Sequence, residues 1–340
     1  MKNRIGFLVE LVTNKRLRKD LKAIRIADKG YAFYAFELCK KTGIIKELEK
    51  KPRTIDELSK KLKLKNKRML EAMLDFLVGK KAIKFDGQQY SLTGYIPLPF
   101  SLAEQDFVTT QYKGAEDWTL FFYGFAEDSL HYGSKHERTG FDDQQAIELW
   151  DSVMVGPLYS LRQIAVKKLL KGLKGGEKII DYGCGSGTAI TEIIERSEKP
   201  LEIIGVDISS KMLKMAEQRV KIIKREDIKV KLLKKDLSKK FYFELLFDCA
   251  FASILINHIP QNERENFYRK VAENLKPNGK FVLFQLVNRT KFDRIFSDWL
   301  LNVVPSHHGF PILNEYISQI KKYFSKVEVL LNGTIVIAYK

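Results

Sequence analysis

The chain has 340 residues, of which 45% are hydrophobic and 30% charged. This composition excludes a disordered or collagen-like chain, and the length suggests about two domains. Lysine and arginine outnumber aspartate and glutamate by 59 to 42, so the net charge is +17. Such an excess raises the expectation of a nucleic-acid or anionic partner, which the motifs must test.

The cysteines and the chain start bear on the compartment. The three cysteines, Cys39, Cys184 and Cys249, are too few and too scattered for a disulfide framework or a zinc site. No apolar run approaches the ~18 residues of a membrane span, and no signal-peptide pattern is present. We therefore expect a cytoplasmic protein. Residues 1–30 are rich in basic side chains and predict either a helix that touches a membrane surface or a solvated helix.

A helical period continues through residues 31–50, and two shorter helices follow. Thr54 and Glu57 have the spacing of a capping box, so a helix should begin at Thr54 and run to Leu62. Asn66 is placed to cap a second helix that ends at Gly79. Two strand-like runs then flank Asp86-Gly87, which favours a type I′ hairpin. Together these elements predict a winged helix.

Residues 96–150 break the regular pattern, and their first part is dense in aromatic side chains. Such a cluster either lines an apolar site for a substrate or forms ordinary core. From about residue 175, strand and helix patterns alternate as in a parallel α/β sheet. The last two strands flank Asn332-Gly333, a hairpin signal. We expect a doubly wound sheet that ends in an antiparallel hairpin.

One glycine-rich loop carries the chemistry. Asp181, Gly183, Gly185 and Gly187 follow a buried strand and open a helix, in a G-x-G-x-G arrangement. Glycine allows a sharp turn and a close approach of the backbone to a ligand. A dinucleotide fold would require G-x-G-x-x-G with amides aimed at a pyrophosphate. The carboxylate of Asp181 would repel a pyrophosphate and favour a cation.

Two further carboxylates end the next strands. Asp207 is placed to accept both hydroxyls of a ribose, and Asp236 to accept the amino group of an adenine. A ligand with a cationic head, a ribose and an adenine but no phosphate is S-adenosylmethionine. The alternatives are a plain tight turn for the glycines and a helix cap for Asp236.

With these motifs the sequence resembles the class I S-adenosylmethionine-dependent methyltransferases. IIDYGCGSG, IIGVDIS, KKDL, FASILINHIP and LKPNGKFVLF are similar to successive motifs of that family. A winged helix ahead of this domain is similar to the small-molecule O-methyltransferases. The resemblance implies a Rossmann-like, seven-stranded methyltransferase sheet with a C-terminal antiparallel hairpin, preceded by a mainly α winged-helix domain that serves dimerisation.

The resemblance also implies the residues around the cofactor. The segments that match place these residues at S-adenosylmethionine: Asp181, Gly183, Gly185, Gly187, Asp207, Ile208, Asp236, Leu237 and Ser253. The family often has a histidine base after the fourth strand. Here that position is Asn257, and His258 is its neighbour. We take His258 as the candidate base, with Asn257 as the alternative that positions a substrate oxygen.

The expected domains are residues 1–98 (winged helix), 99–172 (helical linker and substrate-facing segment) and 173–340 (cofactor-binding domain). The expected reaction is methyl transfer to a small aromatic, quinone or isoprenoid-like acceptor, with O-methylation favoured over C-methylation. The alternative is an RNA or DNA methyltransferase that uses the basic winged helix. We expect a homodimer that forms through the winged-helix domain. We expect no metal site, because His307 and His308 are consecutive and poorly placed to chelate one metal ion together.

Overall fold

The computed structural model describes residues 12–112, 115–133, 140–223, 225–239, 241–289 and 302–340. The chain divides into two compact units. The first comprises residues 1–18, 158–289 and 310–340, and the second comprises residues 19–157 and 290–309. The change of unit at residues 157–158 places the helix over residues 159–170 with the sheet, ahead of the expected boundary at 172–173.

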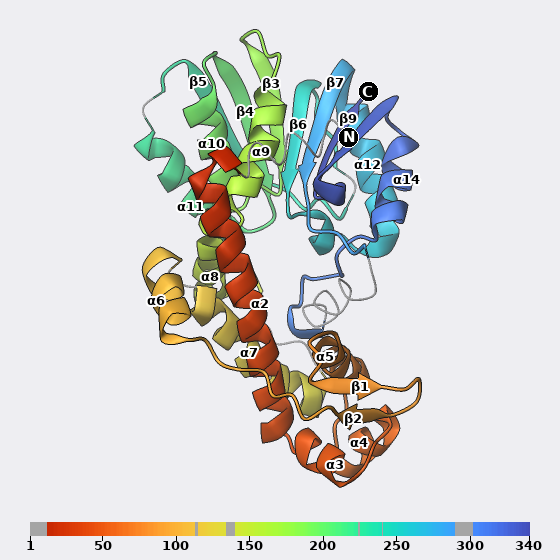
Figure 1. Ribbon diagram of the computed structural model, residues 1–340. Coiled ribbons are helices and arrows are strands. Elements are labelled where there is room, and N and C mark those ends of the chain that lie inside the picture. Colours follow the sequence, from red (N-terminus) through yellow and green to blue (C-terminus); the bar gives the residue numbers. More distant parts are fainter. Residues whose placement is uncertain (1–11, 113–114, 134–139, 224, 240, 290–301) are drawn as a thin grey trace. The chain divides into compact units, whose positions relative to one another are not determined.

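A seven-stranded sheet forms the centre of the first unit, in the order β5-β4-β3-β6-β7-β9-β8 (Figure 1). Strands β3 to β7 pair in parallel, whereas β9 is antiparallel to both β7 and β8. This arrangement confirms the predicted doubly wound sheet with its C-terminal hairpin. The strands are β3 (Glu177–Tyr182), β4 (Leu201–Asp207), β5 (Ile228–Lys234), β6 (Phe247–Ser253), β7 (Leu275–Phe284), β8 (Lys326–Leu330) and β9 (Ile335–Tyr339).

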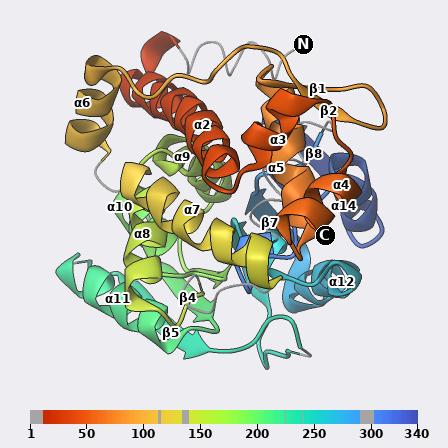
Figure 2. The same cartoon turned by 90° about the horizontal axis from the view of Figure 1, so that it is seen from below.

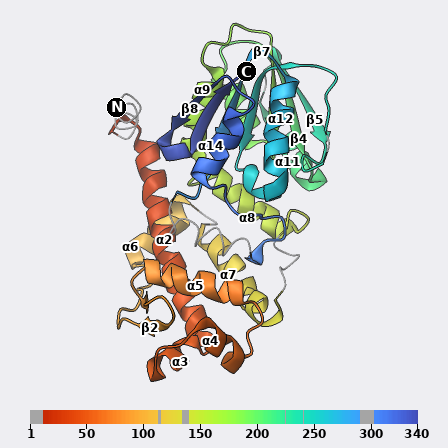
Figure 3. The ribbon, with the colours of Figure 1, turned by 90° about the vertical axis from the view of Figure 1, so that its right-hand side faces the viewer.

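Helices connect these strands, and α12 and α14 lie side by side (Figures 1 and 3). Their ends follow from local signals: Ser209 caps α11 by accepting from the backbone N–H of Met212 at 3.2 Å. Helix α14 has no counterpart in our sequence analysis, although Tyr316 and Ile320 are spaced to bury one face of it. The helices are α9 (Tyr159–Leu170), α10 (Thr188–Arg196), α11 (Ser210–Ile222), α12 (Arg264–Asn274) and α14 (Leu313–Lys321), with the 3₁₀ turns η2 (Ile256–His258), η3 (Gln261–Glu263) and η4 (Leu331–Gly333).

An aromatic cluster anchors the carboxyl end of β3. The ring centroid of Tyr182 lies 5.7 Å from that of Phe241 and 5.6 Å from that of Phe267. Because successive side chains of a strand face opposite sides of the sheet, Asp181 points away from this cluster. The core therefore fixes the strand end on which the glycine-rich loop is mounted.

The second unit contains the predicted helices and hairpin of the front half, which gather together in Figure 2. Thr54 and Glu57 form the expected capping box at the start of α4, and Asn66 caps α5 by accepting from the backbone N–H of Met69 at 3.0 Å. The elements are α2 (Lys15–Lys41, whose first residues count with the first unit), α3 (Ile44–Lys50), α4 (Ile55–Leu62), α5 (Lys67–Gly79), β1 (Ile83–Phe85) and β2 (Tyr90–Leu92).

The predicted type I′ turn at Asp86-Gly87 is wrong. Phe85 pairs with Tyr90, so the loop has four residues rather than two. The side chain of Asp86 accepts from the backbone N–H groups of Gln88 and Gln89 at 2.9 and 2.8 Å. An aspartate that bonds its own following backbone builds this wider turn, whereas a two-residue loop would leave those groups to solvent.

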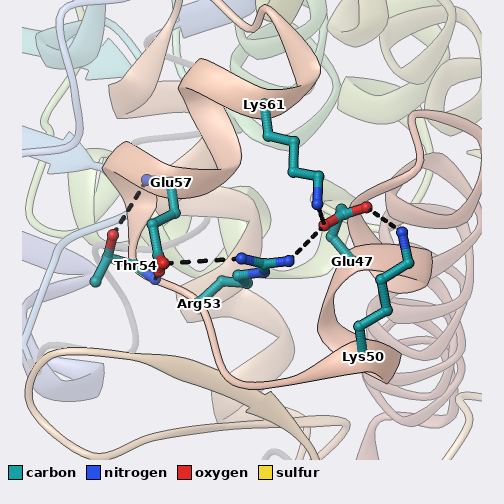
Figure 4. A network of polar contacts seen from close by, with 6 residues as sticks. All are labelled: Glu47, Lys50, Arg53, Thr54, Glu57 and Lys61. Atoms are coloured by element: carbon teal, nitrogen blue, oxygen red, sulfur yellow. Dashed lines mark hydrogen bonds and ion pairs between the residues drawn. The ribbon is translucent and has the colours of Figure 1, made fainter.

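Part of the positive charge in this unit is neutralised locally (Figure 4). The carboxylate of Glu47, with a side chain only 7% exposed, lies 2.6 Å from Lys50, 2.8 Å from Arg53 and 2.7 Å from Lys61. Hydrogen bonds from Lys50 and Lys61 lower the pKa of Glu47 to about 2. Arg53 also lies 3.8 Å from Glu57, so the network joins α3 to α4. These cations serve the fold of the unit.

The stretch predicted as a helical linker is helical in the structure. Ser101 and Glu104 form a capping box that begins α6 (Leu102–Gln111), and α7 (Ala115–Tyr132) and α8 (Gln144–Val155) follow. The aromatic side chains between residues 113 and 123 lie outside the described part, as do residues 1–11 of the basic N-terminus. Among the described residues, no helix is long and apolar enough to cross a membrane.

Candidate functional site

The glycine-rich loop connects β3 to α10 at the point where the sheet order reverses. The chain proceeds from β3 to β4 and β5 on one side, and β6 and β7 lie on the other. Ligands of open α/β sheets bind outside the carboxyl ends of the strands at such a point. The glycines at positions 183, 185 and 187 all have positive φ, at +67°, +52° and +78°, which favours glycine over any other residue.

Each glycine meets a different environment. A Cβ on Gly183 would lie 2.6 Å from Cδ1 of Leu255, and one on Gly187 would lie 2.9 Å from Cβ of Ala216. These two glycines allow the loop to pack against the turn after β6 and against α11. A Cβ on Gly185 would meet nothing within 4 Å. The loop is therefore closely packed at both ends and open at its centre, where a ligand could approach the backbone.

Asp181 is the most unusual side chain of this site. It is 1% exposed, and neither carboxylate oxygen has a hydrogen-bond partner among the described residues. Burial raises the pKa of Asp181 well above its ordinary value, and the nearby charge of Asp207 raises it further, while Arg162 acts in the opposite direction. A buried carboxylate without hydrogen bonds is costly. A bound cation with N–H donors would satisfy it, which fits the ammonium group of a methionine moiety.

Beneath the loop lies a buried ion pair that sequence reasoning missed. Arg162 of α9 is fully buried and donates from Nε to Oε1 of Glu192 of α10 at 3.0 Å, with a second contact from Nη2 at 2.5 Å. Burial raises the pKa of Glu192, against the effect of Arg162. The two residues lie on separate helices, so no spacing in the sequence could have revealed the pair. It places a positive charge behind the acidic site.

Asp207 ends β4 and holds the loop in place. Its carboxylate accepts from the backbone N–H groups of Gly185 and Ser209, both at 2.9 Å. Burial raises the pKa of Asp207, although these backbone hydrogen bonds oppose the shift. The next residue, Ile208, is 53% exposed. An apolar side chain left open beside this carboxylate fits one face of an adenine.

Asp236 and Leu237 follow β5. Oδ1 of Asp236 accepts from the backbone N–H and hydroxyl of Ser238 at 2.9 and 2.6 Å, and Oδ2 lies 3.5 Å from Nζ of Lys239. Burial alone would raise the pKa of Asp236, but these contacts lower it below its ordinary value. Leu237 is buried in the aromatic core. These bonds form a local turn, and no helix follows Asp236 among the described residues, so the helix-cap alternative is wrong. The role of Asp236 toward an adenine stays a prediction.

The turn after β6 contains the candidate catalytic residues. The hydroxyl of Ser253 is buried without a hydrogen-bond partner among the described residues. Ile254 follows with φ of +52°, a strained conformation for a β-branched residue. Asn257 is 1% exposed and accepts from Nε2 of Gln285 at 3.0 Å. His258 ends η2 and is half-buried. Its role as a base stays a prediction.

His307 and His308 belong to the other unit. His307 is fully buried, and its Nδ1 accepts from the backbone N–H of Gly309 at 3.0 Å. Across the described part of the chain, no group of three or more His, Cys, Asp or Glu side chains is placed to hold a metal ion.

Comparison with protein families identifies residues 179–279 as a match to the family described as "Methyltransferase domain". A putative methyltransferase of Geobacillus sp. is 27% identical over 153 residues, covering 44% of this chain and 59% of the relative. A carboxy-S-adenosyl-L-methionine synthase of Nautilia profundicola is 28% identical over 130 residues, covering 37% and 52%. The chain thus spans little more than half the length of these relatives.

Solved structures share the fold over nearly the whole chain. The citrinin polyketide synthase CMeT domain has a TM-score of 0.69 at 13% identity, with 99% of this chain and 93% of that one covered. The CurJ carbon methyltransferase has a TM-score of 0.66 at 14% identity, with 99% and 97% covered. An O-methyltransferase family protein of Burkholderia thailandensis has a TM-score of 0.57 at 13% identity, with 98% and 97% covered.

The chain therefore has the class I methyltransferase fold that the resemblance implied, and its residues 179–279 match a methyltransferase domain. The matched residues 179–279 include the glycine-rich loop and the three strand-end carboxylates. S-adenosylmethionine is the cofactor implied for this domain, and the unpartnered carboxylate of Asp181 and the open space at Gly185 fit it.

Proposed function

We propose that this protein transfers the methyl group of S-adenosylmethionine to a small-molecule acceptor. One observation carries the proposal. Asp181 presents a buried carboxylate with no hydrogen-bond partner among the described residues, directly before a loop whose central glycine faces open space. A phosphate-bearing cofactor would be repelled by this charge, whereas a cationic cofactor would neutralise it. The match of this segment to a methyltransferase domain supports the same cofactor.

The residues proposed to hold the cofactor come from three strand ends. When bound, S-adenosylmethionine supplies an electrophilic methyl group on a sulfonium. Asp181 offers its charge to the cationic methionine part, and Asp207 offers carboxylate oxygens to the ribose while it keeps the loop fixed through Gly185. The remaining proposed contacts are Gly183, Gly187, Ile208, Asp236, Leu237 and Ser253.

The contribution of the protein to such a transfer is mainly alignment and exclusion of water, because the reaction removes charge from the sulfur. Asp181 and Asn257 are each 1% exposed, so water has little access to either side chain. The rigid pairing of β3 with β6 fixes the distance between the loop after β3 and the turn after β6. The site is thus built on strand ends rather than on long loops.

For the acceptor we propose a small aromatic, quinone or isoprenoid-like molecule, with O-methylation ahead of C-methylation. The test is incubation of the full chain with deuteromethyl-labelled S-adenosylmethionine and, separately, a lipid and phenolic extract or total RNA. Mass spectrometry should find the label in a small molecule. Label in RNA alone would favour the nucleic-acid alternative and overturn this proposal. Asp181→Ala is the negative control, and Asn314→Asp, an exposed change on α14, is the matched positive control.

We also propose that the protein forms a homodimer through its N-terminal part. In support, Tyr95, Ile96, Leu98 and Leu102 are between 53% and 88% exposed within one short stretch. Exposed apolar patches of this kind often mark interfaces. Sedimentation of wild type and of Leu98→Glu tests the proposal: the wild type should be dimeric and the variant monomeric. A monomeric wild type would contradict it.

A further inference from the structure

Two buried side-chain amides meet at the turn after β6, and backbone groups fix the orientation of the first. Gln285 follows β7 and is 1% exposed. Its Oε1 accepts from the backbone N–H of Ile256 at 2.9 Å, and its Nε2 donates to the backbone oxygen of Leu286 at 3.1 Å. A backbone N–H can only donate and a carbonyl can only accept. The two contacts therefore agree on which atom of the Gln285 amide is the oxygen and which is the nitrogen.

The orientation of Asn257 follows from that of Gln285. Nε2 of Gln285 also donates to Oδ1 of Asn257 at 3.0 Å. Since a nitrogen donor faces Asn257, the atom that meets it must be the oxygen. Nδ2 of Asn257 therefore points away from Gln285, and it donates no hydrogen bond among the described residues. The turn thus holds the side-chain N–H donor of Asn257 in a fixed direction, and this donor is available to a ligand.

This donor belongs to the proposed site. Leu255, two residues before Asn257, is the side chain that a Cβ on Gly183 would strike at 2.6 Å. The turn therefore packs directly on the loop proposed to hold the cofactor. In this closely packed turn, the backbone of Ile254 adopts a strained positive φ of +52°. Parallel pairing of β6 with β7 brings Gln285 behind the turn, where it serves as a positioning residue for Asn257.

An amide pair has a different chemistry from a histidine base. Neither amide takes up a proton near neutral pH, but an N–H group stabilises negative charge on an oxygen. Resting on the proposed function, we infer that Asn257, oriented by Gln285, donates a hydrogen bond to an oxyanion of the methyl acceptor. The acceptor class is then a phenolate or an enolate, a molecule acidic enough to enter already ionised.

The step balances without a proton acceptor in the protein. The acceptor's proton leaves to solvent before binding. The ionised oxygen, or the carbon of the enolate, forms a bond to the methyl carbon, and the carbon–sulfur bond breaks with its electron pair on sulfur. In both cases the negative charge that Asn257 meets lies on oxygen. The same donor therefore serves O-methylation and C-methylation, and His258 need not accept a proton.

The first test measures binding. The full chain with S-adenosylhomocysteine is titrated with nitrophenols, whose absorbance distinguishes the ionised from the neutral form. Wild type should bind the ionised form selectively. Asn257→Asp keeps the acceptor for Gln285 but replaces the donor with a repelling oxygen, so nitrophenolate affinity should fall about ten- to hundred-fold. The control Asn314→Asp makes the same chemical change on the exposed face of α14 and should bind like wild type.

Gln285→Glu tests the positioning role. A carboxylate there still accepts from Ile256 but repels Oδ1 of Asn257, so Asn257 should turn its oxygen toward the acceptor and the preference for the ionised phenol should disappear. Gln218→Glu, on the exposed face of α11, is the matched control. If Gln285→Glu does not fold, Asn257→Ala replaces it, with loss of the preference expected. Equal binding of neutral and ionised phenols by wild type would overturn the inference.

The second test measures turnover against phenols of graded acidity. The midpoint of the kcat/KM pH profile should move with the pKa of the phenol, in wild type and in His258→Ala alike. A midpoint that stays constant across the series and vanishes in His258→Ala would show a protein base and overturn the inference. Failure to bind S-adenosylhomocysteine would instead refute the proposed function itself. Binding of S-adenosylhomocysteine without any phenolate binding would refute only the acceptor class.

Discussion

Replacement of Asp181 by asparagine should stabilise the ligand-free protein and weaken the binding of the cofactor. The carboxylate is 1% exposed, and its two oxygens lack hydrogen-bond partners among the described residues. Burial without hydrogen bonds costs a neutral polar group about 1–3 kcal/mol, and it costs an ionised carboxylate more than that. Asparagine keeps the shape and removes the charge. We therefore expect Asp181→Asn to raise the free energy of unfolding by about 1–3 kcal/mol at pH 7 without ligand.

The raised pKa of Asp181 predicts how the stability of the wild type changes with pH relative to that of the variant. Burial raises the pKa of Asp181 in the folded state above its value in the unfolded chain, which is about 4. Between the two values the folded chain binds more protons than the unfolded chain, so stability falls as pH rises through this window. Wild type should therefore lose stability relative to Asp181→Asn as pH rises from about 4, and the two should converge below that pH.

For ligand binding, the wild type should be the better of the two proteins. A hydrogen bond to a charged group contributes about 1.5–3 kcal/mol, so Asp181→Asn should bind S-adenosylhomocysteine about ten- to hundred-fold more weakly. The assays are urea unfolding between pH 4 and pH 8 and calorimetric titration of the folded chain. A variant that is less stable than wild type at pH 7 but binds the ligand equally well would refute the reasoning.

Three further substitutions test separate parts of the account. Gly187→Ala places a Cβ 2.9 Å from Ala216 at a positive φ, so it should cost about 1–2 kcal/mol of stability in urea unfolding, and an unchanged midpoint would contradict the packing described. Thr54→Ala removes the cap of α4 and should cost about 1 kcal/mol without altering cofactor affinity by calorimetry. Arg162→Met leaves Glu192 buried without its cation and should cost about 3–5 kcal/mol; retention of wild-type thermal stability would show that the pair is not needed.

The glycine-rich loop and the strand-end carboxylates could be predicted because each signal is local. A buried strand, a run of glycines and a following helix lie next to one another in the chain, and the strand alternation that places Asp207 and Asp236 is equally local. The capping boxes belong to the same class. The capping box of Ser101 and Glu104 is equally local, although the prediction of a helical linker over residues 99–172 did not use it.

The features that depend on register could not be predicted. Gln285 meets Asn257 only because β6 and β7 pair in one particular alignment. Arg162 meets Glu192 only because α9 packs on α10. Likewise, the sequence suggests a two-residue turn at Asp86-Gly87, but the pairing of Phe85 with Tyr90 sets a wider loop. Tertiary packing decides each case, and composition and spacing do not carry that information.

The central claim is that the glycine-rich loop beside Asp181 holds S-adenosylmethionine. Calorimetric titration of wild type and Gly185→Val with S-adenosylhomocysteine tests it most directly, because the space beside Gly185 is free of protein atoms within 4 Å. We expect one ligand to bind per wild-type chain and binding to be lost in Gly185→Val, with the helical circular dichroism retained. Equal binding by both proteins, or no binding by wild type, would contradict the claim.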